Sequence, residues 1–144
     1  MRFISSTNDI RKYLGLKQKR NIKFTSISID TRTLKKGSLF IALRGENFDG
    51  NNFIEKAFSS GANAVLCSDK SYINKNNIIY VQSVRKALSK ISSKIASDFE
   101  GQKILITGSN GKTSTTTIIS KSLPRCSSTI KNFNNEIGLP ISMM

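Results

Sequence analysis

Short apolar runs alternate with amphipathic segments along the chain. Residues 22–29, 38–43, 64–67 and 78–81 are apolar or alternate between apolar and polar positions, which predicts strands. Apolar residues at helical spacing lie between and after these runs, most clearly over residues 83–99. Strands that alternate with helices predict an α/β fold with a mostly parallel sheet.

Polar residues and glycines mark the ends of the expected helices. Thr7 is expected to cap a short helix that Gly15 closes, and Asn51 or Asn52 a second helix that ends at Gly61. These signals predict one short helix before the first strand and another after the second strand.

A glycine-rich loop follows the longest helix. Residues 103–106 predict a strand, residues 107–113 read Thr-Gly-Ser-Asn-Gly-Lys-Thr, and a Thr-rich helix over residues 112–123 comes next. A strand, a glycine-rich loop and a helix N-terminus in this order are typical of a site that holds nucleotide phosphates. The expected ATP-binding residues are Thr107, Gly108, Ser109, Asn110, Gly111, Lys112 and Thr113.

The loop contains residues suited to ATP and to Mg²⁺. Lys112 supplies a cation for the β- and γ-phosphates and is the expected catalytic residue, and the hydroxyl of Thr113 can ligate the metal. The common pattern G-x-x-x-x-G-K-[ST] would place glycine at position 106, where this chain has Ile106, so the motif is the shorter T-G-x-x-G-K-T form. A plain turn after a strand is the alternative interpretation.

The pattern divides the chain into two units. Residues 1–82 are expected to form a small N-terminal α/β domain, and residues 83–144 the beginning of a parallel-sheet phosphate-loop ATPase domain. Because two parallel strands cannot bury both of their apolar faces, we expect the chain to be the N-terminal part of a longer protein.

Composition excludes several classes of chemistry. The 144 residues include no histidine, which rules out Ser-His-Asp and Cys-His catalysis and metal sites built on imidazole. Cys67 and Cys126 show no metal-type spacing and are expected to be reduced. No apolar run approaches the roughly 20 residues of a membrane helix, and no secretory signal is evident, so we expect a cytoplasmic protein without a membrane span.

The net charge of +14 raises the question of a nucleic-acid partner. Lys17, Lys19 and Arg20 form a short basic cluster, but elsewhere the basic residues are scattered. They do not interleave with aromatic residues as they would on a surface that stacks bases, so we expect no nucleic-acid partner. The charge can still attract an anionic substrate.

Several segments together resemble the Mur ligases. Residues 28–32 (Ser-Ile-Asp-Thr-Arg), residues 36–50 (Lys-Gly-Ser-Leu-Phe-Ile-Ala-Leu-Arg-Gly-Glu-Asn-Phe-Asp-Gly) and the following Gly61-Ala62 resemble the N-terminal substrate domain of that family. Residues 107–113 are similar to its ATP loop. Residues 132–140 resemble a segment typical of the member that adds D-alanyl-D-alanine.

The resemblance implies an ATP-dependent amide ligase of peptidoglycan precursor synthesis. In such enzymes ATP, with Mg²⁺, phosphorylates the terminal carboxylate of UDP-MurNAc-tripeptide, and the amine of D-Ala-D-Ala attacks the acyl phosphate. The resemblance implies a monomeric full-length enzyme, and the chain by itself is expected to be inactive. It also implies substrate contacts at Thr31, Arg32, Asn134 and Asn135.

Alternatives remain open for the function and for the individual residues. The sister ligase that adds the third amino acid shares the N-terminal motifs, although Ser109 and the segment Asn-Asn-Glu-Ile-Gly favour the D-alanyl-D-alanine type. A non-catalytic nucleotide-binding module is the alternative from another class. Arg32 can be a surface charge, and Asn134 and Asn135 can be turn formers. Asn51 stands where the family often has histidine.

Overall fold

The computed structural model, which describes residues 4–126, 128–129 and 137–144, contains one sheet of four parallel strands. The strand order is β1 (Ile27–Ser28), β2 (Leu39–Ile41), β3 (Ala64–Cys67) and β4 (Ile78–Tyr80). The helices are α1 (Thr7–Leu14), α2 (Ile54–Ser59), α3 (Val84–Asp98), α4 (Lys112–Ser122) and α5 (Gly138–Met143), with 3₁₀ turns η1 (Gly50–Phe53) and η2 (Lys70–Tyr72). Within the described ranges, no helix is both long and apolar enough to cross a membrane. The predicted α/β class with a parallel sheet is confirmed.

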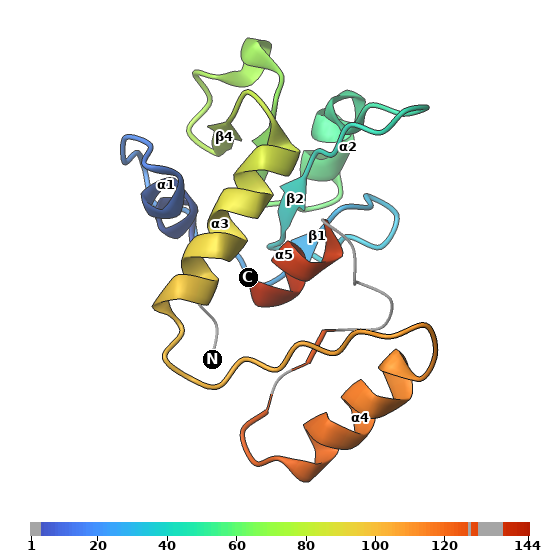
Figure 1. Ribbon diagram of the computed structural model, residues 1–144. Coiled ribbons are helices and arrows are strands. Elements are labelled where there is room, and N and C mark those ends of the chain that lie inside the picture. Colours follow the sequence, from blue (N-terminus) through green and yellow to red (C-terminus); the bar gives the residue numbers. More distant parts are fainter. Residues whose placement is uncertain (1–3, 127, 130–136) are drawn as a thin grey trace.

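Both faces of the sheet are covered (Figure 1). Leu39 and Ile41 of β2 pack into a cluster with residues of α1 and α3, whereas Phe40 points to the other face, toward α2. The register pairs Leu39 with Ala64 and Phe40 with Val65, so the side chains of β3 alternate between the same two faces of the sheet. Burial on both faces explains why these strands are continuous apolar runs in the sequence.

Helix α3 shares the core of the N-terminal sheet. Ser83, the first residue of the helix predicted over residues 83–99, caps it, with its hydroxyl accepting a hydrogen bond from the backbone N–H of Lys86 at 3.4 Å. The apolar stripe of α3 is buried in the same cluster as α1 and the sheet, through Leu88, Ile91 and Ile95. The predicted division at residues 82 and 83 stays a prediction, and this packing favours a boundary after α3.

The first helix is capped by a different residue from the one predicted. Ser6, not Thr7, caps α1 by accepting a hydrogen bond from the backbone N–H of Asp9 at 3.4 Å. Thr7 is fully buried, and its hydroxyl accepts the backbone N–H of Ile22 at 3.0 Å. Gly15 ends the helix in the left-handed conformation, with φ of 72°, as predicted.

Residues 103–106 do not form a strand, and this prediction is wrong for the described structure. Ile104 and Leu105 are 55% and 91% exposed, and no described strand lies beside them. A strand exists only where a neighbouring strand pairs with its backbone, so an apolar run without a neighbour stays irregular. Figure 1 shows this segment leading to α4, which stands apart from the sheet.

Leu88→Ala tests the packing of α3. The Leu88 side chain is fully buried between α3 and the sheet, so its truncation should lower the free energy of unfolding by about 2–5 kcal/mol. Ser89→Ala, on the exposed face of the same helix, should change it by less than about 0.5 kcal/mol. Urea unfolding followed by circular dichroism measures both, and equal stabilities of the two variants would contradict the packing described.

Candidate functional site

The glycine-rich loop ends where α4 begins. Gly111 immediately precedes the helix with φ of 79°, a left-handed conformation that favours glycine. No described side chain caps the first turn of α4, so its backbone N–H groups are available at the positive end of the helix dipole. Thr107, Ser109 and Asn110 are exposed in the same loop. This arrangement suits the binding of an anion.

Lys112 and Thr113 carry the polar groups of this loop. The Lys112 ammonium donates to the carbonyl oxygens of Gly108 and Ser109, the latter at 3.4 Å, and a phosphate would offer it stronger, charge-assisted hydrogen bonds. The Thr113 hydroxyl makes no hydrogen bond within the described residues, whereas the Thr116 hydroxyl bonds to the Lys112 carbonyl. The loop therefore fits ATP, with a cation, uncapped N–H groups and a hydroxyl of the kind that ligates Mg²⁺.

A second polar region lies at the carboxyl ends of the strands. Because the strands are parallel, the chain leaves all of them at one edge of the sheet, where α/β proteins bind ligands. Thr31 and Arg32 follow β1 at this edge. A cleft of about 140 Å³ is lined by residues that follow the other three strands, namely Arg44, Ser68, Gln82, Ser83, Val84 and Arg85.

The cleft at the carboxyl edge is positively charged. Of the residues that the structure describes, two arginines and no acidic residue line it. Its lining also includes Ser83, the N-cap of α3, so the positive end of that helix dipole lies at the cleft. The Arg44 side chain is 77% exposed, with its Nε 3.6 Å from the Asp49 carboxylate. The arrangement favours an anionic group such as a diphosphate.

Arg32 is paired within its own turn. Its Nε lies 3.0 Å from Oδ1 of Asp30 and its Nη2 2.6 Å from Oδ2, so the guanidinium meets both carboxylate oxygens. These hydrogen bonds hold the pKa of Asp30 down to about 2. Thr31 and Arg32 do not line the cleft, so the structure places them at the same edge but not in the same cavity.

Gly50 fixes the loop that carries Arg44. Its backbone N–H donates to the Leu43 carbonyl at 2.7 Å, which closes the loop of residues 44–49. A Cβ at this position would lie 2.4 Å from the same carbonyl oxygen, a distance that no side chain can occupy. Only glycine therefore permits this loop to close so tightly.

Asp49, not Asn51 or Asn52, caps the turn after this loop. Its carboxylate accepts the backbone N–H of Asn51 at 2.9 Å, and this corrects the predicted cap. The Asn51 carboxamide instead bonds to Ser68, accepting from its backbone N–H at 3.1 Å and donating to its hydroxyl at 3.2 Å. Asn51 therefore links the loop to the end of β3, beside the cleft.

Residues 23–96, from the segment before β1 into α3, match the family described as "Mur ligase family, catalytic domain". The chain belongs to the Mur ligase family. The resemblance inferred from the motifs is thus confirmed. The matched segment includes the whole parallel sheet and the edge at which its strands end.

Relatives of two types align with this Mur ligase chain. The UDP-N-acetylmuramoyl-tripeptide–D-alanyl-D-alanine ligase of Buchnera aphidicola subsp. Baizongia pistaciae is 40% identical over 100% of this chain and 32% of its own length. The UDP-N-acetylmuramoyl-L-alanyl-D-glutamate–2,6-diaminopimelate ligase of Aquifex aeolicus is 42% identical over 67% of this chain and 20% of its own.

A solved Mur ligase structure is similar in fold. The crystal structure of MurF ligase from Thermotoga maritima in complex with ADP has a TM-score of 0.67 and 32% identity, and the match covers 82% of this chain and 28% of that one. This chain therefore spans no more than a third of any of these three proteins.

The structure does not test the roles predicted for several residues of this Mur ligase, and these roles stay predictions. Asn134 and Asn135 lie outside the described residues. The roles of Thr31, Arg32 and the phosphate loop depend on ligands and also stay predictions. Residues that the sequence interpretation missed line the cleft. Arg44, Ser68 and Gln82 each directly follow a predicted strand, and Ser83 and Arg85 lie in the first turn region of the next predicted helix, so their position was the signal for them.

The Asp30–Arg32 pair predicts a pH dependence. The pKa of Asp30 is lowered to about 2 in the folded chain, against roughly 3.9 in an unfolded one. The carboxylate therefore contributes stability above about pH 4, and this contribution is lost as the pH falls toward 2. Carboxyl-detected NMR titration should find the low pKa in the native chain and a value close to the ordinary one in Arg32→Ala. Arg44→Ala is the control and should leave the pKa of Asp30 unchanged, and an ordinary pKa in the native chain would contradict the ion pair.

Proposed function

We propose that this chain is the UDP-substrate and phosphate-loop portion of an ATP-dependent ligase that joins D-Ala-D-Ala to UDP-MurNAc-tripeptide in peptidoglycan precursor synthesis. The observation that carries the proposal is the identity with a D-alanyl-D-alanine ligase over the whole length of this chain. The phosphate loop and the basic cleft at the carboxyl edge support it, because the proposed reaction uses two phosphate-bearing substrates.

In this proposal the loop of residues 107–113 binds and orients ATP. Lys112 would turn from the loop carbonyls to the β- and γ-phosphates, and the first N–H groups of α4 would donate to phosphate oxygens. Thr113 would ligate Mg²⁺. ATP with its metal supplies the phosphoryl group that activates the substrate carboxylate as an acyl phosphate. The contribution of these residues is positioning and electrostatic stabilisation.

The cleft at the carboxyl edge is proposed to bind the diphosphate of the UDP-linked substrate. Arg44 and Arg85 offer cationic donors, and the N-terminus of α3 adds its dipole. Thr31 and Arg32 are proposed to lie near the uridine, where Asp30 holds the guanidinium in place. We assign the sheet with α1, α2 and α3 to the UDP-substrate unit and the loop with α4 to the beginning of the ATP-binding unit.

The diaminopimelate-adding ligase is the second candidate function. The 42% identity of the Aquifex aeolicus relative favours it, but that match spans 67% of this chain against 100% for the D-alanyl-D-alanine ligase.

A chimera in which this chain replaces the matching segment of the Buchnera ligase distinguishes the two functions. Phosphate release with UDP-MurNAc-tripeptide and D-Ala-D-Ala would support the proposal. No ligation of D-Ala-D-Ala, or release only with UDP-MurNAc-dipeptide and diaminopimelate, would overturn it.

Lys112→Ala tests the loop in the same chimera. Lys112 is the one cation of residues 107–113, so its removal should lower the ligation rate by about 100-fold or more. The circular dichroism spectrum should not change, because the Lys112 side chain is not part of either apolar cluster. Lys121→Ala, in the last turn of α4, is the matched control and should keep its rate. Normal turnover by the Lys112→Ala chimera would exclude the loop from the reaction.

Arg85→Ala and Arg32→Ala test the carboxyl edge. Loss of a charge-assisted hydrogen bond to the UDP-linked substrate should raise its apparent KM about tenfold and leave the KM for ATP nearly unchanged. Lys94→Ala, on the exposed part of α3, should change neither value. Equal increases in the two KM values would point to a defect in folding and not to a substrate contact.

A further inference from the structure

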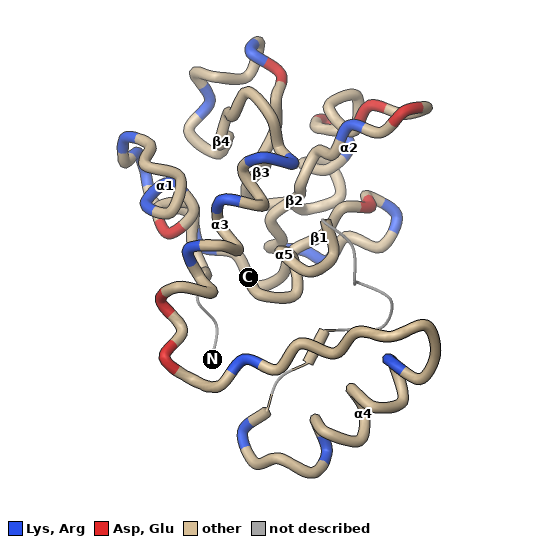
Figure 2. The backbone as a smooth tube through the Cα atoms, in the orientation of Figure 1, with Lys and Arg blue, Asp and Glu red and all other residues tan. Residues whose placement is uncertain are grey.

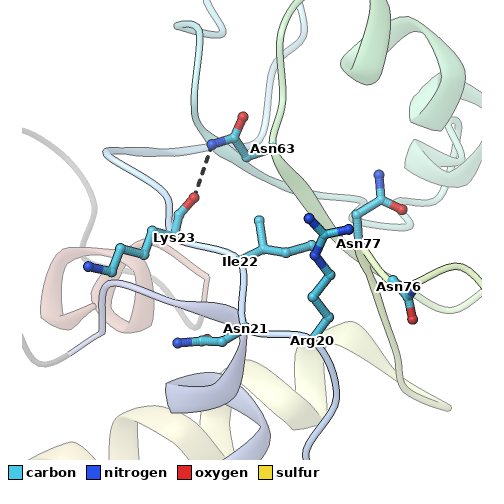
Figure 3. Close-up of a pocket in the computed structure, with 7 residues that line it drawn as sticks. All are labelled: Arg20, Asn21, Ile22, Lys23, Asn63, Asn76 and Asn77. Atoms are coloured by element: carbon cyan, nitrogen blue, oxygen red, sulfur yellow. Dashed lines mark hydrogen bonds between the residues drawn. The ribbon is translucent and has the colours of Figure 1, made fainter.

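A larger polar cleft lies at the opposite, amino-terminal edge of the sheet (Figure 3). Asn63 immediately precedes β3 and Asn77 immediately precedes β4, so the cleft lies where these strands begin and not where they end. Its volume is about 600 Å³, and it is lined by Arg20, Asn21, Ile22, Lys23, Asn63, Asn76 and Asn77. The proposed function uses none of these residues.

Two cations at this cleft have no partner among the described residues. The side chains of Arg20 and Lys23 make no hydrogen bond or ion pair with any other described residue, and no acidic residue lines the cleft. In Figure 3 Arg20 extends toward Asn77, and the Lys23 side chain extends in the opposite direction. Figure 2 shows further basic positions along the segment that follows α1. Both side chains are exposed and therefore able to turn toward a ligand.

The wall that carries these cations is held by hydrogen bonds. The Lys23 carbonyl accepts a bond from the Asn63 carboxamide at 3.0 Å. The Ile22 backbone N–H donates to the buried Thr7 hydroxyl at 3.0 Å, and the Asn21 carboxamide accepts the backbone N–H of Asn8 at 3.2 Å. The backbone beside the cleft is thus fixed, while the charged ends of the side chains remain available.

A buried guanidinium adds positive charge behind this wall. Arg11 of α1 is 5% exposed, and its Nη2 donates to the Ile78 carbonyl at 2.6 Å, beside Asn77. Its Nη1 lies 3.5 Å from the Lys17 carbonyl, so one side chain joins the segment after α1 to the start of β4, next to the residues that line the cleft. No carboxylate pairs with Arg11 in the described part of the chain. Without a carboxylate partner among the described residues, its charge favours an anion nearby.

We propose that this cleft binds a sugar phosphate or a chemically similar small phosphate ester. Arg20 and Lys23 would donate to the phosphate oxygens. The carboxamides of Asn63, Asn76 and Asn77 each offer a donor and an acceptor, which suits the hydroxyl groups of a sugar. The lining has no aromatic ring on which a base could stack, which argues against a nucleotide or a nucleic acid. The cleft is open to solvent, and its volume of about 600 Å³ accommodates a molecule of this size.

Titration with glucose 1-phosphate, followed by ¹H–¹⁵N NMR, tests the proposal. The chain carries Lys112→Ala so that the phosphate loop does not compete. The carboxamide signals of Asn63 and Asn77 should shift, and the double variant Arg20→Ala, Lys23→Ala should weaken binding about tenfold or more. Arg20→Gln with Lys23→Gln provides the same test if the alanine variant does not fold. Lys94→Ala with Lys121→Ala removes equal charge elsewhere and should leave the affinity unchanged.

Other results would overturn the proposal. These are no shift at Asn63 or Asn77 at millimolar probe, equal losses of affinity in the two double variants, or shifts confined to the edge that carries Arg44 and Arg85. Tighter binding of hexaglutamate or of oligothymidylate than of glucose 1-phosphate would assign the surface to a macromolecule instead. Glucose alone and inorganic phosphate alone should each bind more weakly than the ester, because each engages only part of the lining.

Discussion

Burial of both faces of the parallel sheet is the constraint on which the rest of the structure depends. Helices α1, α3 and α5 cover one face and α2 the other, so no face of the sheet is open to a ligand. Only the edges at which the strands begin and end remain accessible. Because all strands run in one direction, the two edges have different chemistry, and each carries its own polar cleft.

The two edges of the sheet show where some of the excess basic residues gather. A net charge of +14 indicates a nucleic-acid partner only when the positions of the basic residues in the fold are ignored. At the carboxyl edge Arg44 and Arg85 adjoin the N-terminus of α3, and at the amino edge Arg20 and Lys23 adjoin a row of carboxamides. Both surfaces suit compact anions, and neither resembles a platform for stacked bases.

The glycine-rich loop of residues 107–113 forms through local interactions. Gly111 adopts its left-handed conformation, α4 starts at Lys112, and the Lys112 ammonium bonds within the loop, although residues 103–106 have no neighbouring strand among the described residues. Conformations of this kind depend on residues within about one helical turn, which is why the sequence correctly predicted that a helix begins at Lys112. The strand before it depends on hydrogen bonds to a distant segment, and its prediction was wrong.

The sequence by itself determined the order of the four strands of the sheet and of the helices, the two-sided apolar character of the strands, the start of α3 at Ser83, the glycine-rich loop and the family. These features depend on backbone conformation and on side chains close together along the chain. The tertiary structure decided which sheet α3 covers, that Asp49 and not Asn51 caps the turn after its loop, and which side chains share each cleft. It brought Arg11 to Ile78 and Asn51 to Ser68, pairs separated by 67 and 17 positions. Such contacts are set by how the layers pack, because a residue's partners across the sheet leave no periodic signal in the sequence around it.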